Sequence, residues 1–178
     1  MKKLILNSKK GILFWITGLS RSGKTSIAKK IKKRLSRLYG PTLEMSGDEF
    51  RTIFKPDDGY TNKARKKNIM KNLIFAKLIT DQKINLIFNL IGMYDYARNW
   101  NRKNIDNYVE IYIEANIHKI MKLKHKRTYL KYKHKRDIVG WDIKAELPKK
   151  PHIIIKNNFH RTITDLSNET IDKIKKLI

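Results

Sequence analysis

The sequence has 178 residues, of which 40% are hydrophobic, and this length suits one domain with a packed core, expected over residues 1–178. It contains no cysteine, which excludes disulfides, thiolate metal sites, iron–sulfur clusters and cysteine nucleophiles. The 41 Lys and Arg residues outnumber the 16 Asp and Glu residues, and the resulting net charge of +25 attracts anionic partners without determining a fold.

Apolar runs alternate with helix-favouring segments, which is typical of βα units around a parallel sheet. The predicted elements are a strand at 12–17, a helix up to about Tyr39, a strand at 42–45, a helix at 62–80, strands at 84–90, 109–113 and 152–155, and a closing helix at the end of the chain. No apolar run is long enough to cross a bilayer, so we expect a cytoplasmic protein without membrane contact.

The segment Gly18–Thr25 fits the pattern G-x-x-x-x-G-K-[ST] and lies between the first predicted strand and helix. Its glycines let successive backbone N–H groups converge on phosphate oxygens, and the N-terminus of the following helix attracts the same anion. Lys24 is expected to reach the β- and γ-phosphates, and the Thr25 hydroxyl to hold Mg²⁺. We therefore predict a site for ATP and Mg²⁺ made of Gly18, Ser20, Ser22, Gly23, Lys24, Thr25 and Ser26.

A second polar group follows the predicted strand at 42–45. Ligands of doubly wound folds bind at the carboxyl ends of the strands, where Asp48 is expected, with Arg51 one helical turn later. Two interpretations are open. Asp48 orients an acceptor hydroxyl and helps to hold Mg²⁺ while Arg51 binds an anionic acceptor, or Asp48 is a helix N-cap and Arg51 a surface residue.

Residues 119–136 are unusually basic, because nine of these 18 residues are Lys or Arg. The first interpretation is a mobile lid, because small P-loop kinases carry one at this place between their last two strands. A solvated surface is the second interpretation. Contact with nucleic acid is the third, since Tyr129 and Tyr132 could stack on bases.

Several segments together resemble the adenylyl-sulfate kinase family, in the same order, over about residues 11–157. The phosphate loop resembles G-L-S-G-S-G-K-[ST], and residues 45–51 resemble L-D-G-D-x-x-R. Residues 60–69 resemble F-S-x-x-D-R-x-E-N-I, Lys126 with Tyr129 resembles K-G-L-Y, and Gly140 with Asp142 resembles T-G-I-D.

The resemblance implies a P-loop kinase-type α/β fold in three layers, with a five-stranded parallel sheet and a basic lid at about 119–140. It implies transfer of the ATP γ-phosphate to the ribose 3′-hydroxyl of a small nucleotide with an acidic 5′ group. Lys24 and Asp48 would be catalytic, and Thr25 and Asp48 would hold Mg²⁺. The acceptor would be bound by Arg51, Tyr60, Arg65, Asn68, Lys126 and Ile138. A homodimer is also considered, whereas nucleic acid is not an expected partner.

The sequence departs from the family pattern at several positions. Ser46 replaces the first aspartate of L-D-G-D, and Leu123-Lys124 replace an arginine–aspartate pair that contacts the purine of ATP. Arg21 replaces a loop glycine, so an ordinary backbone conformation is expected there. Ile138 replaces the lid phenylalanine that stacks on the acceptor adenine, a contact worth about 1–3 kcal/mol per base.

The region after the third predicted strand also differs, because Gly92-Met93-Tyr94 and residues 101–104 replace S-P-Y-R-A-D-R. These residues, Tyr108 and the lid end Ile138-Val139-Gly140 resemble a divergent branch, the cytidine diphosphoramidate kinases, which also phosphorylate a ribose 3′-hydroxyl. The acceptor is thus either adenylyl sulfate or cytidine diphosphoramidate. Two alternatives are a nucleoside monophosphate kinase and a basic P-loop ATPase that binds nucleic acid.

Overall fold

The structure is a computed structural model that describes residues 3–55, 62–122, 139 and 143–178, except for the side chains of 62–66. Its elements are β1 (Leu13–Thr17), α1 (Lys24–Tyr39), β2 (Thr42–Ser46), α2 (Gly47–Phe54), α3 (Asn62–Asp81), β3 (Asn85–Leu90), α4 (Asp95–Asn104), β4 (Tyr108–Glu114), α5 (Ile117–Lys122), β5 (Ile153–Lys156) and α7 (Ile163–Leu177). In the described part of the chain, no helix combines the length and the apolar character needed to cross a membrane.

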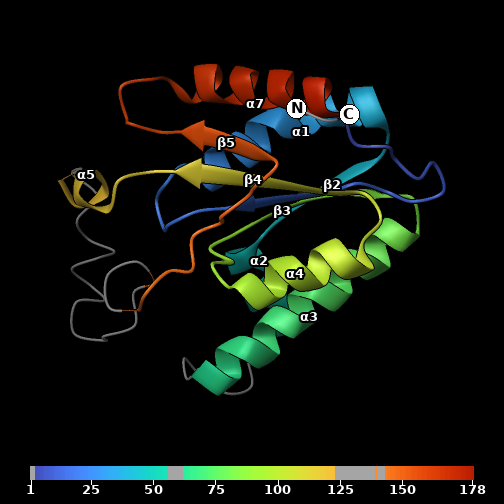
Figure 1. Cartoon of the computed structure of the whole chain (residues 1–178), viewed down its shortest axis with the longest axis horizontal. Helices are drawn as coiled ribbons and strands as arrows, with labels where there is room; N and C mark the ends of the chain where they lie inside the picture. Colours follow the sequence, from blue (N-terminus) through green and yellow to red (C-terminus); the bar gives the residue numbers. More distant parts are fainter. Residues whose placement is uncertain (1–2, 56–61, 123–138, 140–142) are drawn as a thin grey trace.

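The five strands form one parallel sheet in the order β2-β3-β1-β4-β5 (Figure 1). The first strand therefore lies in the middle, with Trp15 beside Phe88 of β3 and Glu110 of β4. Every residue of β1 and β3 is buried, as expected for central strands with both faces covered. Because the strands are parallel, the carboxyl ends of β1, β2 and β3 lie at the same end of the sheet. The phosphate loop follows β1 at this end.

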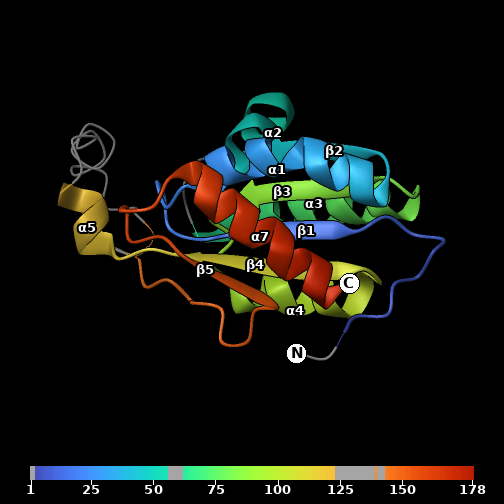
Figure 2. The same cartoon turned by 90° about the horizontal axis from the view of Figure 1, so that it is seen from above.

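Helices cover both faces of the sheet and produce three layers (Figures 1 and 2). On one face, α1 and α7 pack together over Phe14, Ile16 and Ile111. On the other face, α3 and α4 pack over Leu13, Trp15 and Phe88, the alternate residues of the same strands. The predicted three-layer α/β fold with a five-stranded parallel sheet is thus confirmed.

The structure adds detail that the apolar pattern did not predict. Strand β3 carries two buried asparagines, Asn85 and Asn89, whose side chains lie among the apolar residues of the sheet. Asn85 has a structural role, because its Oδ1 accepts from Ile12 N at 2.8 Å and its Nδ2 donates to Tyr39 O at 2.9 Å. Helix α4 was not predicted, and α2 was implied only by the helical spacing expected for Asp48 and Arg51. Both helices start at the carboxyl end of the sheet, where the phosphate loop also lies.

Candidate active site

The phosphate loop is a tight turn in which neither Gly18 nor Gly23 readily accepts a side chain. A Cβ on Gly18 would lie 2.6 Å from Ile113 O and 2.8 Å from Ser22 Oγ. Gly23 has a φ of +98° and caps the N-terminus of α1, and a Cβ there would lie 3.1 Å from Asn157 Nδ2. The Asn157 amide donates to Ser22 O at 2.9 Å, so the segment after β5 supports the loop.

The loop encloses the ammonium group of Lys24. This side chain is only 8% exposed and donates to Leu19 O at 2.6 Å. Burial lowers the pKa of Lys24 from 10.5 to about 7, because the charged form loses its hydration. A phosphate group beside this nitrogen would restore the charged form, so the arrangement suits an anionic ligand.

The other loop residues also suit phosphate. The Ser22 hydroxyl is buried and lacks a hydrogen-bond partner among the described residues. The first-turn N–H groups of α1 receive no side-chain cap at Gly23, and such groups bind anions readily. Ser26 lies exposed in this first turn, and Ser20 lies partly buried in the loop. These residues fit the triphosphate of ATP.

Thr25 is held by a residue that the sequence analysis did not single out. Its hydroxyl donates to Asn89 Oδ1 at 2.8 Å. The Asn89 amide nitrogen donates to Glu44 Oε1 at 2.6 Å and to Met45 O at 3.2 Å. The pKa of Glu44 is raised by burial and by the nearby Glu49 carboxylate. The signal for Asn89 was its polarity inside a buried strand, one residue before the strand ends.

Asp48 and Arg51 lie together on α2, at the carboxyl end of β2. The two side chains form an ion pair, and that of Asp48 is 88% exposed. The interpretation of Asp48 as an N-cap was wrong, because Ser46 caps the helix in a capping box with Glu49. Asp48 is therefore free of a capping role, and its carboxylate projects into solvent beside the edge of the sheet.

The remaining predicted acceptor-binding residues are only partly described. Asn68 lies on α3 and is half-buried, and Arg65 lies on the same helix with its side chain outside the described part. Tyr60, Lys126 and Ile138 lie outside the described residues, as does most of the predicted lid. The first residues of the predicted lid belong to helix α5. Near the end of the predicted lid, Val139 forms a β-bridge with Ile143.

One expectation about the phosphate loop was wrong. Arg21 has a φ of +64°, in the left-handed region, although it replaces a glycine and an ordinary conformation was expected. A residue with a Cβ loses about 1–2 kcal/mol in this conformation. The turn geometry therefore requires the left-handed backbone at this position, whichever side chain is present.

A pocket of about 360 Å³ opens beside the phosphate loop. It is lined by Leu19 of the loop, by residues at the end of β4, and by the segment 143–147. Met93, from the loop between β3 and α4, belongs to the same apolar cluster as Leu19 and Tyr112. Two segments distant in sequence thus meet at the side of the phosphate loop.

Comparisons with known proteins agree with this geometry. The family model for adenylylsulphate kinase matches residues 10–156. The cytidine diphosphoramidate kinase of Campylobacter jejuni is 34% identical over 167 residues, which cover 93% of this chain and 95% of the relative. An adenylyl-sulfate kinase of Clostridium kluyveri is 30% identical over 170 residues, covering 94% and 85%.

Among solved structures, the fold is similar to the Mycobacterium tuberculosis APS kinase CysC in complex with AMPPNP and APS. The TM-score is 0.80 at 23% identity, with 93% of this chain and 98% of the other covered. The family model spans most of the chain and includes the phosphate loop and the residues around Asp48. The chain therefore belongs to the adenylylsulphate kinase family of ATP-dependent phosphotransferases.

Proposed function

We propose that this protein transfers the γ-phosphate of ATP to the ribose 3′-hydroxyl of a nucleotide acceptor, and that cytidine diphosphoramidate is its acceptor. The geometry of Gly18–Thr25 supports the use of ATP, because the loop encloses the Lys24 ammonium and contains a buried Ser22 hydroxyl without a hydrogen-bond partner among the described residues. The acceptor is supported by the relative from Campylobacter jejuni and by the replacement of the adenine-stacking phenylalanine by Ile138. Adenylyl sulfate is the second candidate.

The proposed mechanism depends on positioning and charge stabilisation. The loop N–H groups and Lys24 hold the β- and γ-phosphates, and the Asp48 carboxylate orients the acceptor hydroxyl and accepts its proton late in the transfer. Arg51, paired with Asp48, binds the acidic part of the acceptor. The Thr25 hydroxyl would hold Mg²⁺ together with Asp48, and Mg²⁺ when bound neutralises charge on the transferred group.

The test is a panel of acceptors with MgATP: cytidine diphosphoramidate, adenylyl sulfate, CMP and AMP. ADP formation is measured first, and ³¹P NMR then locates the new phosphate. We expect turnover with cytidine diphosphoramidate and a new phosphomonoester signal from a 3′-phosphate. Lys24→Ala is the control and should show no turnover, while its circular dichroism spectrum stays that of the wild type.

Other outcomes would contradict the proposal in distinct ways. A new phosphoanhydride formed on CMP or AMP identifies a nucleoside monophosphate kinase. ATP hydrolysis that depends on added nucleic acid and falls steeply with salt identifies a P-loop ATPase. Turnover with adenylyl sulfate but not with cytidine diphosphoramidate would support the proposed 3′-hydroxyl kinase activity but contradict the proposed acceptor.

A further inference from the structure

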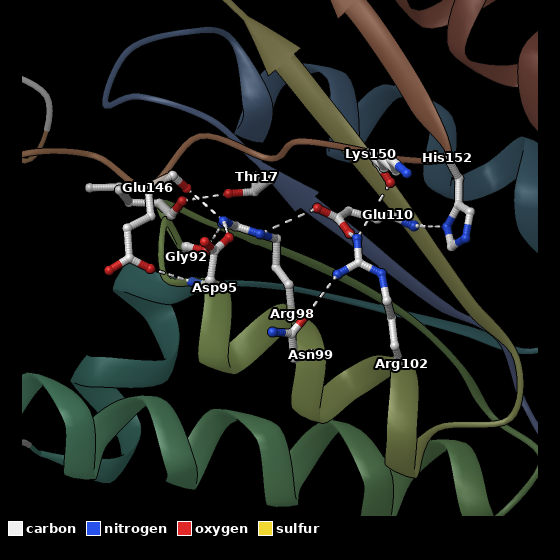
Figure 3. Close-up of polar contacts among 11 residues, drawn as sticks. Thr17, Gly92, Asp95, Arg98, Asn99, Arg102, Glu110, Glu146, Lys150 and His152 are labelled. Carbon is white, nitrogen blue, oxygen red and sulfur yellow. Dashed lines mark hydrogen bonds and ion pairs between the residues drawn. The ribbon is translucent and has the colours of Figure 1, made fainter.

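The side chain of Arg98 on α4 is almost completely buried and lies at the centre of a polar network (Figure 3). Its Nη1 donates to Gly92 O at 3.3 Å, and its Nη2 donates to Glu146 O at 2.6 Å. The guanidinium also pairs with Asp95, and its Nε lies 3.6 Å from Glu110 Oε1. One side chain thus contacts three separate parts of the chain.

These contacts join two segments that are far apart in sequence. Gly92 and Asp95 belong to the connection from β3 into α4, whereas Glu146 belongs to the segment after the predicted lid. Two further hydrogen bonds join the same segments: Asp95 N donates to Glu146 Oε2 at 2.5 Å, and Glu146 N donates to Met93 O at 3.3 Å. Arg98 donates to one backbone carbonyl in each segment, so it connects the backbones of the two segments directly.

A buried arginine in this place needs compensation, because a guanidinium that leaves water loses its hydration. Glu110 of β4 supplies the opposite charge and is itself completely buried. Arg102, one turn along α4, also pairs with Glu110. The planar fork of arginine can serve the two carbonyls and the carboxylates together, which the single nitrogen of lysine cannot.

Both joined segments lie beside the phosphate loop. The segment 143–147 lines the pocket of about 360 Å³ together with Leu19, and Met93 packs in the same apolar cluster as Leu19. Gly92 has a φ of +46°, and its Cβ would lie 3.2 Å from the Trp15 ring, so the loop is pressed against the sheet. A change in the contacts of Arg98 would therefore displace the wall of this pocket.

We propose that Arg98 is a positioning residue that holds residues 92–95 and 143–147 together as one wall of the acceptor site. The proposal rests on the proposed function, since that function places an acceptor next to the phosphate loop. Arg98 acts through these segments and does not contact ATP or the acceptor itself. Its loss should thus impair acceptor binding selectively.

Arg98→Met removes the donors while keeping much of the apolar stem, and Arg102→Met is the matched control. Arg102 is 36% exposed and shares Glu110, but it makes none of the contacts to Gly92 or Glu146. We expect Arg98→Met to raise the acceptor KM about tenfold or more and to change the ATP KM less than about twofold. Arg102→Met should change both less than about twofold. Equal effects of the two variants, or an unchanged acceptor KM in Arg98→Met, would overturn the proposal.

A second pair of variants protects the test if Arg98→Met does not fold. Glu146 is exposed, so its substitution does not disturb the core. Glu146→Ala removes the acceptor for Asp95 N and should raise the acceptor KM several-fold, whereas Glu146→Gln keeps an oxygen there and should resemble the wild type. The same KM in both variants would contradict the role of this contact.

Hydrogen exchange separates this proposal from the proposed function, since it needs no turnover. In Arg98→Met without ligands, peptides covering 92–98 and 143–147 should exchange about tenfold faster, whereas peptides from α1 should not change. This result supports the positioning role even if every acceptor in the panel fails. A uniform increase over the whole chain, or no increase in these two segments, would overturn it.

Discussion

The Thr25 hydroxyl donates a hydrogen bond to Asn89 Oδ1, and the two oxygens lie 2.8 Å apart. The amide of Asn89 cannot be reversed without loss, because its nitrogen donates to Glu44 and to Met45 O. The proton of Thr25 therefore points toward β3, and its lone pairs are left for a cation. This is the orientation that a hydroxyl ligand of Mg²⁺ requires, and residues that orient a ligand in this way affect metal affinity strongly.

Asn89→Ala should weaken the binding of a magnesium-bound ATP analogue about tenfold, because Thr25 loses its fixed orientation. Calorimetric titration with a non-hydrolysable analogue measures this affinity with and without Mg²⁺. The metal-free affinity is the internal control and should not change. An equal loss in both conditions would mean that Asn89 supports the loop as a whole and not the metal ligand.

Asn89→Asp should lower the free energy of unfolding by about 1–3 kcal/mol, because two carboxylates would then meet where an amide now donates to Glu44. The double variant Asn89→Asp with Glu44→Gln restores a donor facing an acceptor, and should regain most of this loss. Urea unfolding of the four proteins in the cycle measures the coupling. Strictly additive effects would show that the two side chains do not interact.

Nucleotide binding should take up close to one proton at about pH 8.5, because the pKa of Lys24 is lowered to about 7 in the free protein and a phosphate restores its charge. At about pH 6 Lys24 is already charged, so uptake by this group should vanish. Titration with MgADP in two buffers of different ionisation enthalpy measures the protons. A heat that is independent of the buffer at the higher pH would contradict the lowered pKa.

The same pKa fixes how the stability of the free protein depends on pH. Lys24 is charged in both states below about pH 7, and the unfolded chain keeps its proton up to 10.5. The contribution of Lys24 to the free energy of unfolding therefore rises with pH between about 7 and 10.5, since the unfolded state binds more protons than the folded state in this range. Lys24→Met should remove this part of the rise, as measured by urea unfolding across the pH range.

Asp48→Asn should lower kcat at least about tenfold and change ATP binding little, because in the proposed mechanism the carboxylate acts on the acceptor hydroxyl. Glu49→Gln is the matched control on the same helical turn. It removes a charge but keeps an oxygen for the Ser46 hydroxyl, so the cap of α2 persists. Steady-state kinetics with both substrates varied separate the two effects. A change confined to the ATP KM would contradict the role of Asp48.

Arg21→Gly should stabilise the protein by about 1 kcal/mol, because glycine accepts a φ of +64° without the steric cost of a Cβ. Lys83 has a φ of +63° in the turn between α3 and β3, away from the phosphate loop, and Lys83→Gly is the control. Thermal unfolding should give similar gains for both variants. Only Arg21→Gly should alter nucleotide affinity, and a gain for Lys83→Gly alone would show that Arg21 is not strained.

The central strands could be predicted from the sequence because β1 and β3 are buried on both faces and so appear as mostly apolar runs. The strand predicted at 12–17 is Leu13–Thr17, and that at 109–113 is Tyr108–Glu114. The phosphate loop could be predicted for a different reason: its backbone geometry allows few residues at Gly18 and Gly23. The motif thus reflects steric limits that act locally along the chain.

Helix α4 and its network could not be predicted in this way. The face of α4 toward the sheet buries Ala97, Arg98 and Asn101, so it lacks the apolar periodicity of a packed helix. The partner of Arg98, Glu110, interrupts a strand that is otherwise mostly apolar. A charged residue in a sequence suggests the surface, and only the three-dimensional pairing of the two shows why both are buried.

This pairing also restricts how the sequence can diverge. Replacing Arg98 alone leaves the buried Glu110 with Arg102, and replacing Glu110 alone leaves the buried Arg98 with Asp95, so each single change weakens the compensation of a buried charge. Substitutions at positions 98 and 110 should therefore be correlated among related sequences. Arg102 pairs with Glu110 and would keep it neutralised until the second substitution is acquired.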